Sequence, residues 1–458
     1  MAAAGSAAAR PGGAPPVLWS VVEESLDEAD FLWRRREAAL AAHDQTPAGV
    51  EFRIEERLLG AIEGLCVPGD AAVDRLLAPA LEAGEPSMVA VAAQALAVGE
   101  TAAGIDCLTA AFLRASGARL QALRRGLELT PLAGPYLRLA ASTNDAPDAV
   151  RAAFLEACAF RGLPLEPRLG ERLTSASPEL QRAAARLLRH APPAMRSEWL
   201  PHALELVDRR AREAAVETAL IVGARSAWGA CRELAVADIN PSGAMLLPLA
   251  MVGTAHDHQL ALAALAQGAR RREALWAIGF GGRRAGADAC VDLLAQEVDA
   301  REVRLAAESF CAITGLDLRD AGLAASAPAS ESDEPPAFED EDLDADLVPR
   351  EEDRLPVPDV SGLIRWWNRN RSRFDADARY LRGCPVGVGP LVDALAKGPM
   401  RRRRPLAFEL AVRTQGRVQL ETGALIADQR RCLATTGAAS SAGAIGRRAS
   451  ETSVGARR

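Results

Sequence analysis

The stretch LQRAAARLLRHAPPAMRSEWLPHALELV (residues 180–207) decides the fold class. Its first half spaces apolar side chains at i, i+3, i+4, i+7 and i+8, at Leu180, Ala183, Ala184, Leu187 and Leu188. This spacing lines one face of an α-helix. A small residue and two prolines then interrupt the pattern, and a second apolar run follows. The stretch therefore predicts two short helices joined by a turn, each with one face to bury.

The same unit returns along the chain from residue 86 to residue 321. Small residues interrupt the apolar runs at Gly99, Gly162, Ala191, Gly223, Gly253, Gly281 and Gly315, with a weaker copy near Gly126. A spacing of about 28 to 36 residues is typical of helical repeats, which must stack because no single pair buries its apolar face alone. Strand-like alternation is absent. We expect an all-α fold, a HEAT-like α-solenoid with a C-terminal helical domain.

Composition divides the 458 residues into further segments. The irregular helical region 17–85 is expected to cap the repeats, and 358–435 to form the C-terminal helical domain. Residues 322–357 are rich in Asp, Glu and Pro, which is typical of a disordered acidic linker. Residues 1–16 and 436–458 are expected to be disordered tails.

Charge, cysteine usage and hydropathy limit the cellular setting. The net charge is −7, yet residues 361–458 hold 19 basic and 7 acidic residues, which gives +12 there and leaves −19 for the remainder. Such asymmetry indicates an interaction surface or internal pairing. The 8 cysteines form no CxxC pair, which favours a reducing compartment. No secretory signal and no run of about 18 apolar residues is found, so a cytoplasmic location without membrane contact is expected.

No motif predicts catalysis, a metal or a cofactor. The HDH run at residues 256–258 offers two histidines two positions apart, which do not face each other on a helix. The glycine-rich GFGGRRAG at residues 279–286 follows no strand, so a turn is preferred over a dinucleotide loop. We expect a protein that is not an enzyme and that binds no cofactor.

Two arginine-rich segments are the candidate partner-binding residues. RWWNRNRSRF (residues 365–374) combines arginines with aromatic rings, and RRRR (residues 401–404) precedes a proline-started helix. The candidates are Arg365, Trp366, Arg369, Arg373, Arg401, Arg402, Arg403 and Arg404. In the first segment, Trp366 and Trp367 are expected to anchor a core, with nucleic-acid stacking or a partner contact as alternatives. Cations at a helix N-terminus need anionic neighbours, which the acidic linker, a protein partner or a nucleic acid could supply.

Residues 272–318, REALWAIGFGGRRAGADACVDLLAQEVDAREVRLAAESFCAITGLDL, resemble HEAT repeats of the phycobilisome-lyase type. Three further segments join this resemblance: VVEESLDEADFLWRRREAAL from residue 21, PVPDVSGLIRWWNRNRSRFDADARYLRGCP from residue 356, and MRRRRPLAFELAVRTQG from residue 400. Together they resemble an uncharacterised proteobacterial HEAT-repeat family often encoded beside type VI secretion genes. The resemblance implies an accessory role with a secretion spike, adaptor or effector as protein partner, and supplies no catalytic residues. The first functional hypothesis is a protein-binding scaffold; the alternative is a nucleic-acid-binding regulator that uses the arginine-rich C-terminal domain.

Overall fold

The computed structural model describes residues 17–164, 166–237, 242–296, 299–325 and 350–441. The prediction of an all-α repeat fold is confirmed, since the described residues are mostly helical and their only β-strands are β1 (Tyr380–Leu381) and β2 (Cys384–Pro385), which form one hairpin. The expected tail at 1–16, residues 442–458 of the tail expected at 436–458, and residues 326–349 of the acidic linker expected at 322–357 lie outside the described residues.

The N-terminal region is built from one long helix and several short ones. Its α-helices are α1 (Trp19–Ala41), α2 (Pro47–Val50), α3 (Glu56–Cys66), α4 (Asp70–Ala72) and α5 (Ala78–Ala83), with π-helical turns η1 (Glu51–Glu55) and η2 (Val73–Leu77). The long helix α1 packs on α3 and α6, so this region closes the start of the repeat array.

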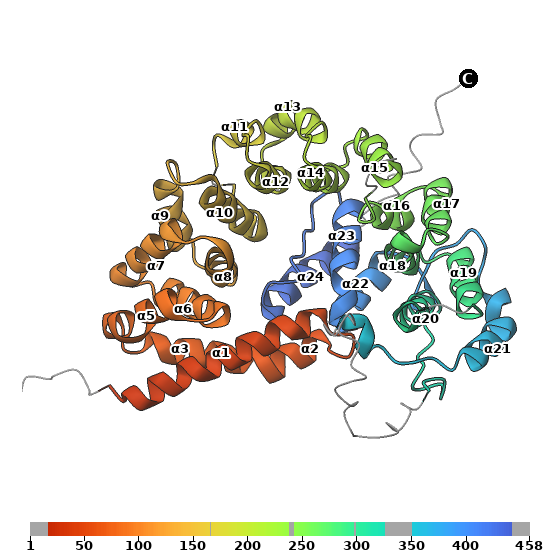
Figure 1. Ribbon diagram of the computed structural model, residues 1–458, viewed down its shortest axis with the longest axis horizontal. Helices are drawn as coiled ribbons and strands as arrows, with labels where there is room; N and C mark the ends of the chain where they lie inside the picture. Colours follow the sequence, from red (N-terminus) through yellow and green to blue (C-terminus); the bar gives the residue numbers. More distant parts are fainter. Residues whose placement is uncertain (1–16, 165, 238–241, 297–298, 326–349, 442–458) are drawn as a thin grey trace, which may run out of the picture.

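The repeats alternate an inner and an outer helix. The inner helices are α6 (Pro86–Gly99), α8 (Gly117–Glu128), α10 (Asp148–Arg161), α12 (Pro178–Leu187), α14 (Arg209–Ile221), α16 (Leu246–Val252), α18 (Arg271–Gly281) and α20 (Ala300–Thr314). The outer helices are α7 (Ala102–Arg114), α9 (Gly134–Ser142), α11 (Leu169–Leu173), α13 (Pro193–Leu204), α15 (Ala227–Val236), α17 (Ala255–Ala264) and α19 (Arg284–Leu294), with 3-10 turns η3 (Leu188–His190) and η4 (Gly268–Arg270). Figure 1 shows them following one another around an arc.

The quoted stretch folds as its pattern predicts. Leu180, Ala183, Ala184, Leu187 and Leu188 are all buried, and the chain turns before α13 begins at the second proline. Turns elsewhere use left-handed backbone, as at Gly162 (φ 69°) and Gly315 (φ 77°), a conformation that glycine adopts without strain. Inner helices pack on their successors, and one apolar core runs through the array.

The C-terminal residues do not form one separate domain. Their elements are η5 (Glu351–Arg354), α21 (Val360–Asn370), η6 (Arg371–Arg373), the hairpin, α22 (Val388–Lys397), η7 (Met400–Arg402), α23 (Arg403–Arg413) and α24 (Ile426–Ser441). Helix α21 packs on α19 at the end of the array, whereas α22, α23 and α24 lie inside the arc (Figure 1). Helix α23 contacts both α14 and α16, and α22 to α24 share a small second core.

These inner C-terminal helices connect the two ends of the array. The N–H groups of Met400 and Arg401 donate to the carbonyl oxygens of Gln45 and Ala42, just beyond α1, at 2.9 and 3.1 Å. The same arginine pairs with Glu308 of α20. Two sequence-based boundaries shift as a result: residues 350–357 dock on the array, and α24 continues to residue 441.

Candidate protein-binding surfaces

The RRRR segment is largely inside the molecule. The Arg401 guanidinium lies 2.6 Å from a carboxylate oxygen of Glu352 and 3.4 Å from one of Glu308, and 4.9 Å from the Trp276 ring centroid. Glu352 belongs to the segment predicted as acidic linker, so the anionic neighbours come from the chain itself. Burial opposes protonation of Arg401, but these two carboxylates outweigh it and raise its pKa.

The next two arginines are buried more deeply. Arg402 is 7% exposed and stands 3.9 Å from the Phe280 ring centroid, a cation–π contact. Arg403 is 1% exposed and donates to the carbonyl oxygen of Leu395 at 2.8 Å; burial lowers its pKa to about 10. In this conformation Arg402 and Arg403 offer no surface to a partner, while Arg404 is exposed.

Helix α21 divides the other candidate segment between core and surface. Trp367 is 2% exposed, donates to Asp288 at 2.9 Å and meets the Phe310 ring edge to face, with centroids 5.3 Å apart. Trp366 is half-buried against the same phenylalanine. The tryptophans therefore anchor α21 to the array, whereas the sequence predicted that they anchor the core of a C-terminal domain.

The opposite side of α21 carries Arg365, Arg369 and Arg373, which we call the α21 stripe. All three are exposed and spaced at i, i+4 and i+8, so they follow one side of the helix into η6. Arg365 lies 3.9 Å from a carboxylate oxygen of Asp359, and Arg373 donates to Asn370. The stripe is thus a cationic surface at the far end of the array.

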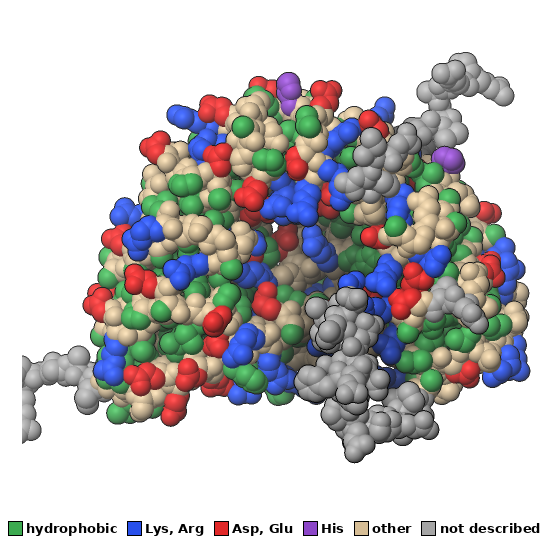
Figure 2. All heavy atoms as spheres, in the orientation of Figure 1, with side chains coloured by type: hydrophobic (Ala, Val, Ile, Leu, Met, Phe, Trp, Pro, Cys, Tyr) green, Lys and Arg blue, Asp and Glu red, His purple; other side chains and the backbone are tan. Residues whose placement is uncertain are grey.

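A cavity of ≈ 1030 Å³ lies between the inner helices and the C-terminal helices. In Figure 2, Lys and Arg side chains border a hollow at the centre of the molecule. Arginines and glutamates line the cavity in equal number: Arg124, Arg125, Arg186, Arg189, Arg272, Arg401, Arg404, Glu37, Glu128, Glu156, Glu217, Glu273, Glu352 and Glu421. Most of them are paired with each other across neighbouring helices, for example Arg186 with Glu156 at 2.7 Å.

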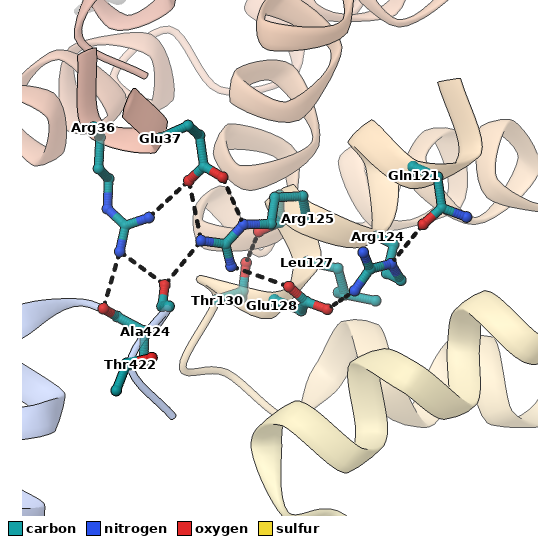
Figure 3. A network of polar contacts seen from close by, with 12 residues as sticks. Arg36, Glu37, Gln121, Arg124, Arg125, Leu127, Glu128, Thr130, Thr422 and Ala424 are labelled. Atoms are coloured by element: carbon teal, nitrogen blue, oxygen red, sulfur yellow. Dashed lines mark hydrogen bonds and ion pairs between the residues drawn. The ribbon is translucent and has the colours of Figure 1, made fainter. Parts of the chain in front are cut away.

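One wall of this cavity includes residues 419–423. They belong to residues 417–441, which we call the C-terminal strap. Figure 3 shows Arg36 of α1 and Arg125 of α8 pointing at its main chain. Both arginines donate to the carbonyl oxygen of Gly423 at 2.9 Å, and Arg36 also donates to that of Ala424 at 2.9 Å. Arg36 is fully buried, with its Nε 2.8 Å from Glu55.

Three further contacts fix the strap. The N–H of Ile426 donates to Glu55 at 2.7 Å, Glu421 pairs with Arg189, and Asp428 lies 3.4 Å from Arg161. Polar side chains of five elements, α1, η1, α8, α10 and η3, therefore hold both the main chain and the charged side chains of one segment.

The pKa shifts in this network reflect burial and ion pairing between its members. Burial works against the charged form of Glu37, but the charge and hydrogen bonds of Arg125 outweigh it, so the pKa of Glu37 is lowered. Burial raises the pKa of Glu128 although two arginines contact it. Among the described residues, no group of three His, Cys, Asp or Glu side chains is placed to hold a metal ion.

Sequence reasoning missed Arg36 and Arg125. Arg36 did carry a signal, because it occupies a position of α1 that helical periodicity assigns to the buried face, after Ala29, Leu32 and Trp33. Arg125 carried none, since nothing local relates it to a segment about 300 residues away.

No family model, no curated protein and no solved structure matches this chain. Across the described residues, no helix combines the length and apolarity needed to cross a bilayer.

Proposed function

We propose that this chain is a non-enzymatic, protein-binding scaffold or adaptor. The observation that carries the proposal is that the inner surface of the array already holds a polypeptide, the C-terminal strap. Part of this contact is made with main-chain groups of the strap. Arg36 and Arg125 donate to a carbonyl oxygen, and Glu55 accepts a hydrogen bond from an N–H. Repeat arrays commonly bind extended or helical segments along their concave side.

The α21 stripe supports a second contact. It lies at the end of the array, away from the strap, and its exposed arginines favour an anionic surface on the partner. An accessory role in type VI secretion, with a spike, adaptor or effector as partner, rests on the sequence resemblance. Nucleic-acid binding, the alternative function, would use the α21 stripe and Arg404, because Arg402 and Arg403 are buried.

The test is capture of partners by the tagged full-length chain in its native cell, followed by cross-linking mass spectrometry. The stripe variant R365Q/R369Q/R373Q is compared with R119Q/R210Q/R225Q, which removes three exposed arginines from other repeats. We expect one specific protein that survives nuclease treatment, with recovery reduced only in the stripe variant. Recovery of nucleic acid alone, or of no specific partner, would refute the proposal.

A further inference from the structure

The C-terminal strap is held by polar contacts as well as by apolar packing. Leu425 and Ile426 join the core of the array, and Leu420 and Leu433 join the second core. Hydrogen bonds and ion pairs hold its main chain and its carboxylates. The strap joins α23 through one turn, at Gln415 and Gly416, which have φ of 52° and 75°. Rearrangement of this turn could therefore release the strap from the array without unfolding α23.

Open hollows border the strap on two sides. The central cavity lies on one side, and a hollow of ≈ 330 Å³ lies between α10 and the strap, lined by Phe160, Arg161 and Asp428 among others. The carbonyl oxygens of two strap side chains, Gln419 and Gln429, are buried without a hydrogen-bond partner among the described residues, and Gln429 is only 1% exposed. Both side chains line the smaller hollow.

The residues that contact the strap, which we call the seat, each bind a particular group of it. Arg189 pairs with the carboxylate of Glu421, and Arg36 and Arg125 donate to the carbonyl oxygen of Gly423 two positions later. Glu55 accepts a hydrogen bond from the N–H of Ile426, the first residue of α24. A Cβ added to Gly423 would lie 3.3 Å from an Arg125 nitrogen and 3.4 Å from the Phe160 ring. A side chain at that position would therefore require Arg125 or Phe160 to shift by a few tenths of an ångström.

We infer that the C-terminal strap is a replaceable occupant of this seat, and that the partner protein binds there with a segment of the same chemistry. That segment carries an acidic residue, a glycine two positions on, and then a helix with an acid in its first turn. The inference rests on the proposed scaffold function and adds where and how the partner binds. The strap keeps the seat closed until such a segment displaces it.

The size of the expected effect follows from tethering. A short tether holds a segment at a local concentration of about 1 mM, so a free segment with a Kd of about 10 μM appears about a hundredfold weaker while the strap is seated. Releasing the strap should restore that affinity.

The test measures binding of a labelled synthetic peptide of residues 417–436 to full-length proteins by fluorescence anisotropy. In the variant Gly423→Leu the side chain extends beyond a Cβ that already stands 3.3 Å from Arg125 and 3.4 Å from Phe160, which should unseat the strap. The matched control is Gly229→Leu, because a Cβ at that exposed position meets nothing within 4 Å. Hydrogen exchange of the strap amides is followed in each protein, and E421A/D428A, which removes the strap carboxylates, is the second releasing variant.

We expect the peptide to bind G423L and E421A/D428A at least tenfold more tightly than wild type or G229L, together with faster exchange of the strap. Faster exchange without tighter binding would show that the seat accepts no free segment and would overturn the inference. Unchanged exchange and binding in both releasing variants, or equal peptide binding by all four proteins, would overturn it too. Tight peptide binding combined with no captured partner would count against the scaffold function and leave the replaceable strap intact.

Discussion

His258 should make the middle of the array sensitive to mild acid. It is 1% exposed on α17, and neither ring nitrogen has a hydrogen-bond partner in the part of the chain that the structure describes. Burial, together with the positive charges of Arg283 and Arg379, lowers its pKa to about 4. In the unfolded chain a histidine titrates near 6.5, so between these two values the unfolded state binds a proton that the folded state does not.

The sign and size of the effect follow from this difference. Stability is unaffected above about pH 6.5 and falls as the pH drops toward 4. Between pH 7.5 and 4.5 the loss from this one group is about 2.5 kcal/mol, which is about a 70-fold change in the opening equilibrium. Arrays open locally, so the change should appear in the elements packed around α17, namely α16 and α18.

The perturbation is His258→Leu, which removes the titrating ring and its two unpaired nitrogens. Hydrogen-exchange protection factors of α16 to α18 are measured at pH 7.5 and 4.5, in the variant, in wild type and in His256→Gln. The control changes an exposed histidine of the same helix. We expect wild type and H256Q to lose about 70-fold more protection than H258L over this range. Equal losses in all three proteins would refute the reasoning.

Three further outcomes are expected. Gly126→Ala should lower the thermal midpoint through a cost of about 1 to 3 kcal/mol, because its Cβ would lie 2.3 Å from a carbonyl oxygen of α6, whereas Gly229→Ala should not; equal melting curves would contradict this. Exposed Cys384 should be alkylated before Cys158, whose pKa burial raises, and peptide mapping after brief treatment at pH 8 checks the order. Glu409→Ala should cost about 3 to 5 kcal/mol by leaving its arginine partners at a buried site, and a urea midpoint within error of wild type would count against that.

The repeat array was predictable because its determinants are local. Spacing of Leu180, Ala183 and Leu187 within a few turns reports which face of α12 is buried, and it needs no knowledge of distant residues. The same holds for Trp367, whose place on the apolar side of α21 identified it as an anchor.

The position of the C-terminal helices was not predictable in the same way. The contacts that hold the strap join Arg36 to Gly423 and Ala424 across almost the whole chain, and no periodicity encodes a pairing over that separation. The arginines of 401–404 were also ambiguous, because a sequence of cations is compatible with solvent, a partner or an internal carboxylate. Only the structure shows that Arg401 forms ion pairs with Glu308 and Glu352.

Closure of the arc also fixes the number of repeats. An open solenoid tolerates the gain or loss of a unit, since each unit touches only its neighbours. Here Met400 and Arg401 must reach the end of α1 while contacting α20, so one unit more or fewer would move one of those docking points away from the other. Synthesis imposes an order as well. The repeats emerge first and can fold locally, whereas the arc closes only after the last helices leave the ribosome.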